Sequence, residues 1–376
     1  MKRALAWVVG LVFWAVTVHA NPYFDPTKPH HAPDGFRNLT GVQVDKPFSW
    51  LLRWRIDALR DGLPPPPQQA TPVALPELRL LRANTAPVRR AGVQATVPPL
   101  PSVTWIGHAT VLVQSGGLNI LTDPVFSDRA SPVSFLGPRR EQPPGVALED
   151  LPAIDVVVIS HNHYDHLDRL GVVQLNERAR GHTLFLVPLG LKPFFTQLGI
   201  GNVIELDWWD IHTHEGVQFH LVPVQHWSAR GLGDRNQTLW GGWAVFAPDL
   251  RWYFSGDAGY SRHFKETREK LAPHARDGAL FDVALLAIGA YEPRWFMKEQ
   301  HMNPAEAVQA HQDLAARRSL GIHWGTFALT DEALDQPPRD LALARAQRGL
   351  AEQDFFVLPI GGTWWPAGPP AALPKQ

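Results

Sequence analysis

The sequence predicts an α/β fold in which two β-sheets pack face to face and helices cover both outer faces, a four-layered αββα sandwich. From residue 101 onward, short apolar runs typical of buried strands alternate with segments typical of helices, in both halves of this region. Such alternation favours βαβ units. In addition, His and Asp residues follow several of the apolar runs, and α/β proteins place their ligand sites at the carboxyl ends of strands.

Length and composition are those of a globular protein with one large domain or two ordinary ones. The chain has 376 residues, of which 45% are hydrophobic and 19% charged. Its formal net charge of −1 gives no overall field that would attract nucleic acid, so no nucleic-acid partner is expected. The chain contains no Cys, which excludes disulfides, thiolate metal sites and a catalytic cysteine. Fifteen Trp residues fit either a large core or a surface that is half apolar and half wet.

Residues 1–20 have the pattern of a secretory signal. Lys2 and Arg3 give a positive start, an uncharged and mostly apolar run extends to Val18, and Ala20 supplies a small residue at a cleavage position. The run is short for a membrane-spanning helix, and an uncleaved N-terminal anchor is the alternative. In either case we expect an exported protein, periplasmic or membrane-associated.

Residues 21–100 form an N-terminal extension without strong periodicity. A short amphipathic helix is expected at residues 48–59, where Trp and Leu alternate with Arg and Asp. Four prolines at 64–67 favour a stiff extended segment. We expect the extension to pack against the domain that follows, with contact to lipid as the alternative. His30 and His31 are interpreted as surface or packing residues rather than as metal ligands.

The second domain is expected at residues 101–365, and its elements can be placed in order. Strands are predicted at 103–106, 110–114, 118–122, 155–159, 183–188, 203–206, 217–224, 240–246, 251–254, 283–288 and 355–358, and an apolar segment at 319–322 leads to His323. Helices are predicted at 168–178, 192–198, 262–271 and 340–348, and another begins at Pro304 after the capping residue Asn303. Residues 126–146 are predicted to form a long irregular loop.

Four side chains that bind metals lie within six residues, directly after the predicted strand at 155–159. They are His161, His163, Asp165 and His166. In an extended chain His161 and His163 point to the same side, whereas Asp165 and His166 follow a turn and serve a second position. Imidazole suits zinc, and a carboxylate can ligate or bridge beside it. The alternative is a polar surface loop.

Three more candidates share the same topological position. His226, Asp257 and His323 each follow an apolar strand and precede a break or a small residue. Each is therefore expected at the carboxyl end of a strand, on the same rim as His161. A single residue of this kind is more often structural, and only the joint placement predicts a shared metal site.

The series from His161 to His323 resembles the metal ligands of the metallo-β-lactamase superfamily. Segments 105–110, 161–168, 205–209, 288–298 and 322–329 are similar to those of the N-acylphosphatidylethanolamine-hydrolysing phospholipase D family, and the likeness covers about residues 101–360. The resemblance implies a metallo-β-lactamase-fold hydrolase domain at 101–365. One departure is Ser134-Phe135, where animal members have Gln-Tyr in a loop expected to face the substrate.

The resemblance implies two zinc ions. His161, His163 and His226 would hold one ion, Asp165, His166 and His323 the other, and Asp257 would bridge them. Bridging anions are needed because two divalent ions at short distance repel each other, and the ions lower the pKa of bound water. The water would attack phosphorus, with Asp165 as a possible proton acceptor.

The implied activity is that of a zinc-dependent phosphodiesterase of phospholipase D type. It would hydrolyse N-acylphosphatidylethanolamine-like phospholipids at a membrane surface to an N-acylethanolamine and a phosphatidic acid. One alternative is a lactone or amide hydrolase on the same dinuclear site. Another is a non-catalytic, metal-dependent lipid-binding protein. Family likeness also suggests a homodimer.

Further residues are candidates for roles around the metals. His108 and Asp123 are expected to orient ligands, with packing as the alternative for His108. Tyr164 and His301 are candidates for contact with the substrate phosphate and headgroup. Phosphate-binding candidates are Arg230 and Arg294, and candidates for an apolar rim are Trp208, Trp209, Trp227, Trp295, Phe296 and Trp324, although structural roles explain several of these residues equally well.

Overall fold

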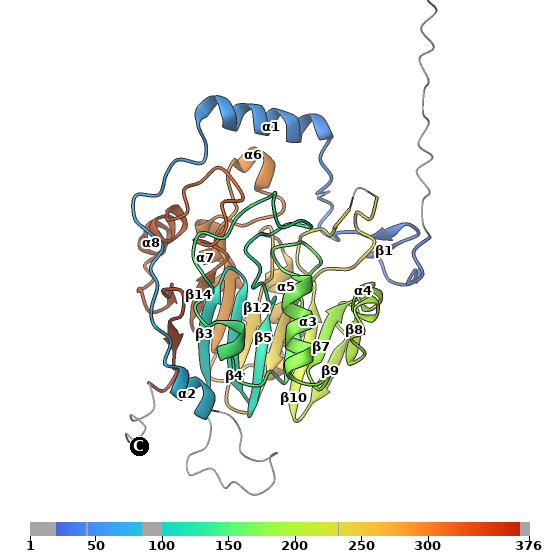
Figure 1. Ribbon diagram of the computed structural model, residues 1–376, viewed down its shortest axis with the longest axis vertical. Helices are drawn as coiled ribbons and strands as arrows, with labels where there is room; N and C mark the ends of the chain where they lie inside the picture. The colour runs from blue at the N-terminus through green and yellow to red at the C-terminus, as the bar shows by residue number, and fades with distance from the viewer. Residues whose placement is uncertain (1–19, 43, 85–99, 232, 369–376) are drawn as a thin grey trace, which may run out of the picture.

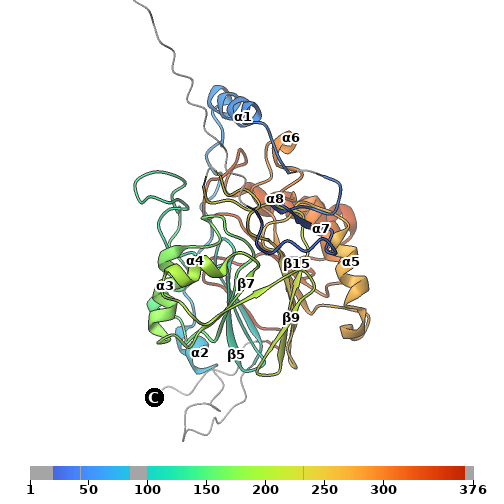
Figure 2. The ribbon, with the colours of Figure 1, turned by 90° about the vertical axis from the view of Figure 1, so that its right-hand side faces the viewer.

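Two seven-stranded sheets pack face to face with helices on both outer sides in the computed structural model, which describes residues 20–42, 44–84, 100–231 and 233–368. Figures 1 and 2 show this arrangement, with α3 (Arg169–Arg178) and α4 (Lys192–Gln197) on one side, and α5 (His263–Lys270), α7 (Pro304–Asp313) and α8 (Gln336–Arg348) on the other. The αββα architecture expected from the sequence is confirmed.

The first sheet combines antiparallel hairpins with parallel strands in the order β16-β3-β4-β5-β6-β7-β8. Its strands are β3 (Ser102–Gly107), β4 (Thr110–Ser115), β5 (Leu118–Thr122), β6 (Val156–Val158), β7 (Leu184–Pro188), β8 (Val203–Leu206) and β16 (Thr363–Trp364). Gly116 and Gly117 form the β4–β5 turn at φ values of 60° and 76°, and a tight hairpin turn needs such positive values. Strands β5 to β8 run parallel, so their carboxyl ends meet at one rim of the sandwich.

The second sheet has the order β15-β14-β13-β12-β11-β10-β9, and β12 to β15 run parallel. Its strands are β9 (Ile211–His214), β10 (Val217–Val222), β11 (Gly242–Phe246), β12 (Arg251–Phe254), β13 (Val283–Ala287), β14 (Ser319–Ile322) and β15 (Phe355–Phe356). The sequence did not predict β9 or β16. β9 is a polar edge strand whose side chains are mostly accessible, and β16 is only two residues long.

Capping chemistry explains where α3 and α7 begin. Asp168 caps α3 by accepting a hydrogen bond from the backbone N–H of Leu170, and Asn303 with Glu306 forms a capping box at α7. The helix predicted at 340–348 is confirmed, but α8 begins four residues earlier, at Gln336. Pro337 fits its first turn, where backbone N–H groups have no intrahelical acceptor.

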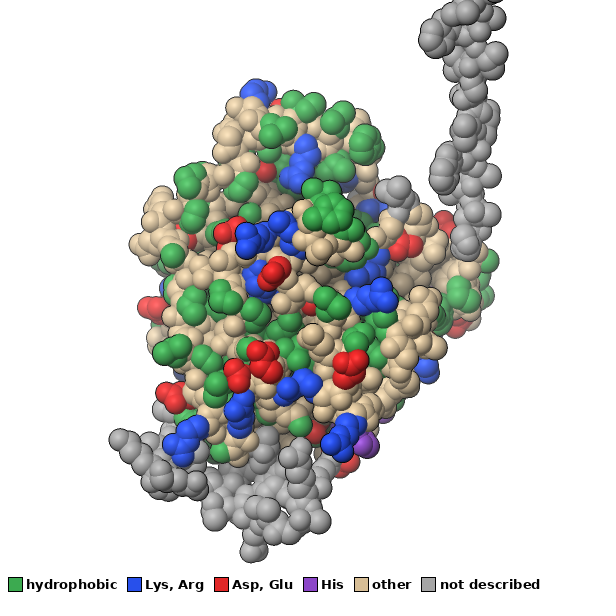
Figure 3. All heavy atoms as spheres, viewed as in Figure 1, with side chains coloured by type: hydrophobic (Ala, Val, Ile, Leu, Met, Phe, Trp, Pro, Cys, Tyr) green, Lys and Arg blue, Asp and Glu red, His purple; other side chains and the backbone are tan. Residues whose placement is uncertain are grey.

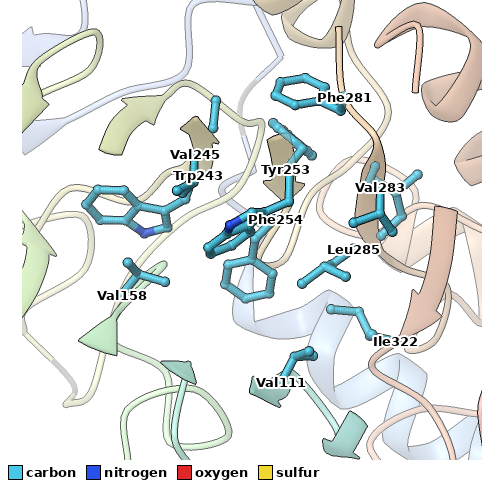
Figure 4. Close-up of a cluster of buried hydrophobic side chains, with 14 of the residues drawn as sticks. Val111, Val158, Trp243, Val245, Tyr253, Phe254, Phe281, Val283, Leu285 and Ile322 are labelled. Atoms are coloured by element: carbon cyan, nitrogen blue, oxygen red, sulfur yellow. The ribbon is translucent and has the colours of Figure 1, made fainter. Parts of the chain in front are cut away.

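The core fills the space between the two sheets. Val111 and Val158 from the first sheet face Trp243, Phe254 and Ile322 from the second, all of them fully buried (Figure 4). The two interpretations of the many Trp residues both hold, for different residues. Trp105, Trp240, Trp243 and Trp252 lie in the core, whereas Trp50 and Trp295 are exposed at the rim.

The N-terminal extension contains β1 (His31–Ala32), β2 (Gly35–Phe36), α1 (Phe48–Asp61) and α2 (Leu78–Ala83). His30 and His31 are buried against Asp207, so the surface alternative was wrong. With Asp207 they form a further group that could hold a metal ion. In α1 only Trp54 and Ala58 are buried, and the other apolar side chains are accessible. None of the helices within the described residues is long and apolar enough to cross a membrane. The expected signal or anchor falls on residues 1–19, which lie outside the described part.

Candidate metal centre

The seven predicted ligands converge at the carboxyl rim of the sandwich. His161, His163, Asp165 and His166 lie in the loop after β6. His226 follows β10, Asp257 follows β12 and His323 follows β14. Their ligand atoms form two adjacent groups that could each hold a metal ion, one with His161, His163, His226 and Asp257, the other with Asp165, His166, His323 and His108. Residues up to 162 positions apart in the chain are thus brought into one centre.

The first group is an arrangement of three imidazoles and one carboxylate. Nε2 of His161 lies 2.8 Å from Nδ1 of His163, and Nε2 of His226 lies 3.3 Å from the same Nδ1. Oδ2 of Asp257 is 3.8 Å from Nε2 of His161 and 3.7 Å from Nε2 of His226. Ligands about 2.1 Å from a tetrahedral zinc ion are separated by about 3.4 Å, so these spacings fit one ion.

Asp257 of the first group also lies close to two histidines of the second. Nε2 of His166 lies 3.2 Å from Nε2 of His323 and 3.1 Å from Oδ2 of Asp257, and Nε2 of His323 lies 3.0 Å from Oδ1 of Asp257. Oδ2 of Asp165 is 3.5 Å from the Nε2 atoms of both histidines. Asp257 therefore lies between the two groups, in the position that a bridging carboxylate needs.

Partners on the far side of the rings fix the histidines in ligand orientation. Nδ1 of His166 donates to Oδ2 of Asp123 (2.7 Å), and Nδ1 of His226 donates to the carbonyl oxygen of Gln300 (3.0 Å). Each of these bonds places the proton on Nδ1 and leaves the Nε2 lone pair directed at the centre, as in metal sites. Asp123 is thus placed as expected for a residue that orients a ligand, because it accepts the hydrogen bond from Nδ1 of His166. His108 lies beside the second group, with its Nε2 3.0 Å from Oδ2 of Asp165.

Asn38 in the N-terminal extension also holds the centre, and the sequence did not reveal it. Its Nδ2 donates to the carbonyl oxygen of His226 (2.9 Å), and its Oδ1 accepts from the backbone N–H of His226 (3.2 Å). The partners are 188 residues apart, and no local pattern in the sequence marks such a contact. The extension is therefore a structural part of the metal centre.

Burial and charge set the protonation of the centre. Burial lowers the pKa of His163 to about 3 and that of His226 to about 4, so both rings are neutral at pH 7, as metal ligands must be. Burial alone would lower the pKa of His166 too, but the charges of Asp257 and Asp165 raise it well above its usual value. Positive charge is thus favoured beside these carboxylates, whether a proton or a metal ion carries it.

Several predicted substrate contacts are engaged elsewhere. The hydroxyl of Tyr164 donates to the carbonyl oxygen of Arg230 (3.0 Å), while the Arg230 guanidinium stacks on the Tyr164 ring and donates to the carbonyls of Asn162 and Leu167. These bonds hold the ligand loop together, so a phosphate-binding role for Tyr164 and Arg230 is not supported. The guanidinium of Arg294 likewise has partners within the protein. It donates to the carboxylate of Glu306 (2.7 Å) and to two backbone carbonyl oxygens.

His301 is the predicted substrate residue that does lie at the centre. Its ring centroid is 5.4 Å from that of His226 and 5.7 Å from that of His323, and its Nδ1 is 4.0 Å from Oδ2 of Asp257. Contact with substrate remains a prediction for this residue. Of the aromatic candidates, Trp208 and Trp324 are core residues, whereas Trp227, Trp295 and Phe296 lie near the rim.

Comparison with known proteins identifies the family. A family model described as "Beta-lactamase superfamily domain" matches residues 118–324. The chain is 44% identical over 273 residues to the N-acyl-phosphatidylethanolamine-hydrolyzing phospholipase D 1 of Caenorhabditis elegans, covering 69% of this chain and 74% of that protein. This chain belongs to the metallo-β-lactamase superfamily and to that phospholipase D family. It is a metal-dependent hydrolase. An uncharacterized protein of Mycobacterium tuberculosis is 37% identical over 324 residues, 84% of this chain and 79% of that protein.

Solved structures share the fold at low sequence identity. A possible metal-dependent hydrolase from Veillonella parvula matches with a TM-score of 0.57 at 16% identity, over 71% of this chain and 99% of that chain. An isothiocyanate hydrolase from Delia radicum gut bacteria matches with a TM-score of 0.55 at 19% identity, over 70% of this chain and 98% of that chain. These likenesses concern the fold alone.

Proposed function

We propose that this protein is a zinc-dependent phosphodiesterase of phospholipase D type that hydrolyses N-acylphosphatidylethanolamine-like phospholipids. The observation that carries the proposal is the paired ligand arrangement with Asp257 between the two groups. The named activity of the relative from Caenorhabditis elegans supports the substrate class. The combination of imidazoles and carboxylates suits two zinc ions.

Hydrolysis needs one water and breaks the phosphorus–oxygen bond to the N-acylethanolamine. Two divalent ions, when bound, supply an activated water and positions for phosphate oxygens. Burial would raise the pKa of the Asp165 carboxyl, but the charge of His166 and the hydrogen bond from His108 hold it well below its usual value. Asp165 is therefore ionised and able to accept the proton of the attacking water. The oxygen of the water stays on phosphorus in the phosphatidic acid, and the alcohol leaves with a proton.

A membrane surface as the source of substrate is supported by the apolar residues at the rim. Along α1 the side chains of Phe48, Leu52, Ile56 and Leu59 share one face at helical spacing, and all are exposed, Phe48 by 76% and Leu59 by 84%. Trp54 and Ala58 lie on the opposite face, against α6 (Arg294–Met297). Figure 3 shows hydrophobic side chains gathered over α1, with Lys and Arg side chains close by.

The loop with the departure from the animal pattern also exposes apolar side chains. Phe135 is 79% exposed, and its neighbour Leu136 is exposed as well. Arg53, Arg55 and Arg60 flank the outward apolar face of α1, which suits an interface with anionic headgroups. We therefore propose that an exported form of the protein takes its substrate from a lipid surface facing α1.

The test is hydrolysis of N-acylphosphatidylethanolamine in vesicles by zinc-replete protein, with both products identified by mass. We expect His166→Ala to lose more than the roughly 10–100-fold that changes around metal ligands cost, and chelation to abolish turnover. His182→Ala is the matched control, because this exposed histidine precedes the amino end of β7, whereas the metal centre lies at the carboxyl ends of the strands. Turnover that survives chelation would exclude the mechanism. Hydrolysis of lactones without any of phosphodiesters would favour a carbonyl hydrolase.

A further inference from the structure

A segment of the N-terminal extension crosses the rim beside the metal centre and is anchored on both sides. We call residues 36–42 and 44–47 the strap. Asn38 is hydrogen-bonded to both backbone polar groups of His226, and Arg235 donates to the carbonyl oxygen of Val44. Val44 is itself buried. The strap thus has a fixed position relative to a metal ligand.

Near the end of the strap, the buried ammonium group of Lys46 has no hydrogen-bond partner among the described residues. It lies 4.5 Å from the centroid of the Phe296 ring. The other cations nearby are paired, Arg235 with Asp45 (3.2 Å) and Arg294 with Glu306 (2.7 Å). Lys46 is therefore the cation of this region that the strap and its neighbours leave unpaired.

The segments with Phe296 and with Arg235, which lie around Lys46, both contact histidines of the metal centre. The chain that contains Phe296 continues to Gln300 and His301. The carbonyl oxygen of Gln300 accepts the hydrogen bond from Nδ1 of His226. On the other side, the guanidinium of Arg235 lies 4.1 Å from the centroid of the Trp227 ring. That ring lies 4.3 Å from the ring of His163. Lys46 thus lies beside two segments that each contact a histidine of the metal centre.

A buried ammonium without an anion is unfavourable, and a bound anion removes that cost. We propose that the Lys46 ammonium binds an anionic phosphate oxygen of the lipid substrate beside the metal centre. This inference rests on the proposed function, which makes a phosphate group the anion delivered to this rim. Lysine binds phosphate as a point charge through its three donors.

The charges that face Lys46 define a pH dependence. Burial lowers the pKa of the ammonium to about 8, the charge of Glu299 opposes this change, and Arg235 and Arg294 add to it. Asp45, adjacent in the strap, is engaged by Arg235. Because only the protonated amine attracts phosphate, KM for the lipid should rise as the pH increases through about 8. In Lys46→Arg this rise should disappear, since guanidinium stays charged.

The experiment compares Lys46→Met, Lys46→Arg and the wild type as full-length, zinc-replete proteins. For Lys46→Met we expect KM to rise by roughly 10-fold or more, the size of one charge-assisted hydrogen bond, with kcat little changed. Lys192→Met, at an exposed position, is the matched control and should leave KM unchanged. Thermal melting checks the fold of each variant. An unchanged KM in a folded Lys46→Met protein overturns the proposal.

A second measurement separates this inference from the proposed function. Binding of inorganic phosphate is measured by calorimetry on the wild type and on Lys46→Met, independently of any turnover. Weaker phosphate binding by the variant supports an ammonium–phosphate contact even if the wild type hydrolyses no lipid. A rise in KM without a change in phosphate binding supports a contact made only by the lipid-borne phosphate. Where the wild type hydrolyses the lipid, an unchanged KM overturns the proposal whatever the phosphate binding. Where it hydrolyses none, equal phosphate binding by the two proteins overturns it.

Discussion

At the scale of single residues, the metal centre depends on side chains that touch no substrate. Asp123 follows β5, is fully buried and has a positive φ of 29°, a conformation that costs energy in a residue other than Gly. It accepts from the backbone N–H of Ser160 (2.7 Å) and from Nδ1 of His166. The strained backbone thus places one carboxylate between the start of the ligand loop and its last histidine.

We expect Asp123→Asn to weaken metal binding in the second group by about 10–100-fold, the cost typical of losing the outer partner of a metal-bound histidine. The variant loses the negative charge that favours the Nδ1 proton of His166. Metal content after dialysis and competition with a chelator measure the change. Asp277→Asn, at a highly exposed position, is the control. Two ions held with wild-type affinity by Asp123→Asn would contradict this role of Asp123.

The ligands were predictable because each follows a recognisable strand, whereas their supporting contacts were not. His226, Asp257 and His323 could be placed on one rim from strand ends alone. Asn38 and the carbonyl of Gln300 support His226 through contacts over 188 and 74 residues, which depend on tertiary packing. The same limit applies to Tyr164 and Arg230, whose contact with each other could not be read from the sequence.

At the scale of elements, the N-terminal extension behaves as a part of the domain. Asp207, which follows β8, is the partner of three side chains of the extension. Its Oδ1 lies 2.6 Å from Nε2 of His30, and its Oδ2 lies 3.0 Å from Nε2 of His31 and also contacts the ammonium of Lys28. Hydrogen bonds from His30 and Lys28 lower the pKa of Asp207 although burial would raise it. The sequence predicted that the extension packs, but its polar residues gave no sign of this buried cluster.

We expect Asp207→Asn to lower the free energy of unfolding by roughly 3–5 kcal/mol, because the variant leaves buried donors without their anion. The depressed pKa means that the stabilisation is complete above the carboxyl's unfolded pKa, near 4, and is lost as pH falls through the folded value. Wild type and variant should therefore differ most near neutral pH and converge in strong acid. Chemical unfolding across this range measures the difference. Asp34→Asn, exposed in the same extension, should match the wild type.

At the scale of the whole molecule, α1 presents two apolar faces, and the protein itself covers only one of them. The face with Trp54 stacks on Phe296, with ring centroids 5.0 Å apart. The other face, with Phe48, Leu52, Ile56 and Leu59, is exposed on the rim that carries the metal centre (Figures 1 and 3). A helix apolar on both faces is stable in water only when something covers the second face. A lipid surface fits, because the substrate proposed for the adjacent centre resides there.

We expect Leu52→Glu with Ile56→Glu to weaken binding to anionic vesicles by more than about 10-fold, since each buried Leu or Ile contributes about 1.5–3 kcal/mol. Hydrolysis of a water-soluble phosphodiester should stay unchanged, because neither residue contacts the metal ligands. Leu343→Glu, at an exposed site on α8, is the control for added charge. Sedimentation measures the oligomeric state of each protein. If the double variant binds vesicles normally but dissociates a dimer, the outward face of α1 joins two copies of this chain and the lipid assignment is wrong.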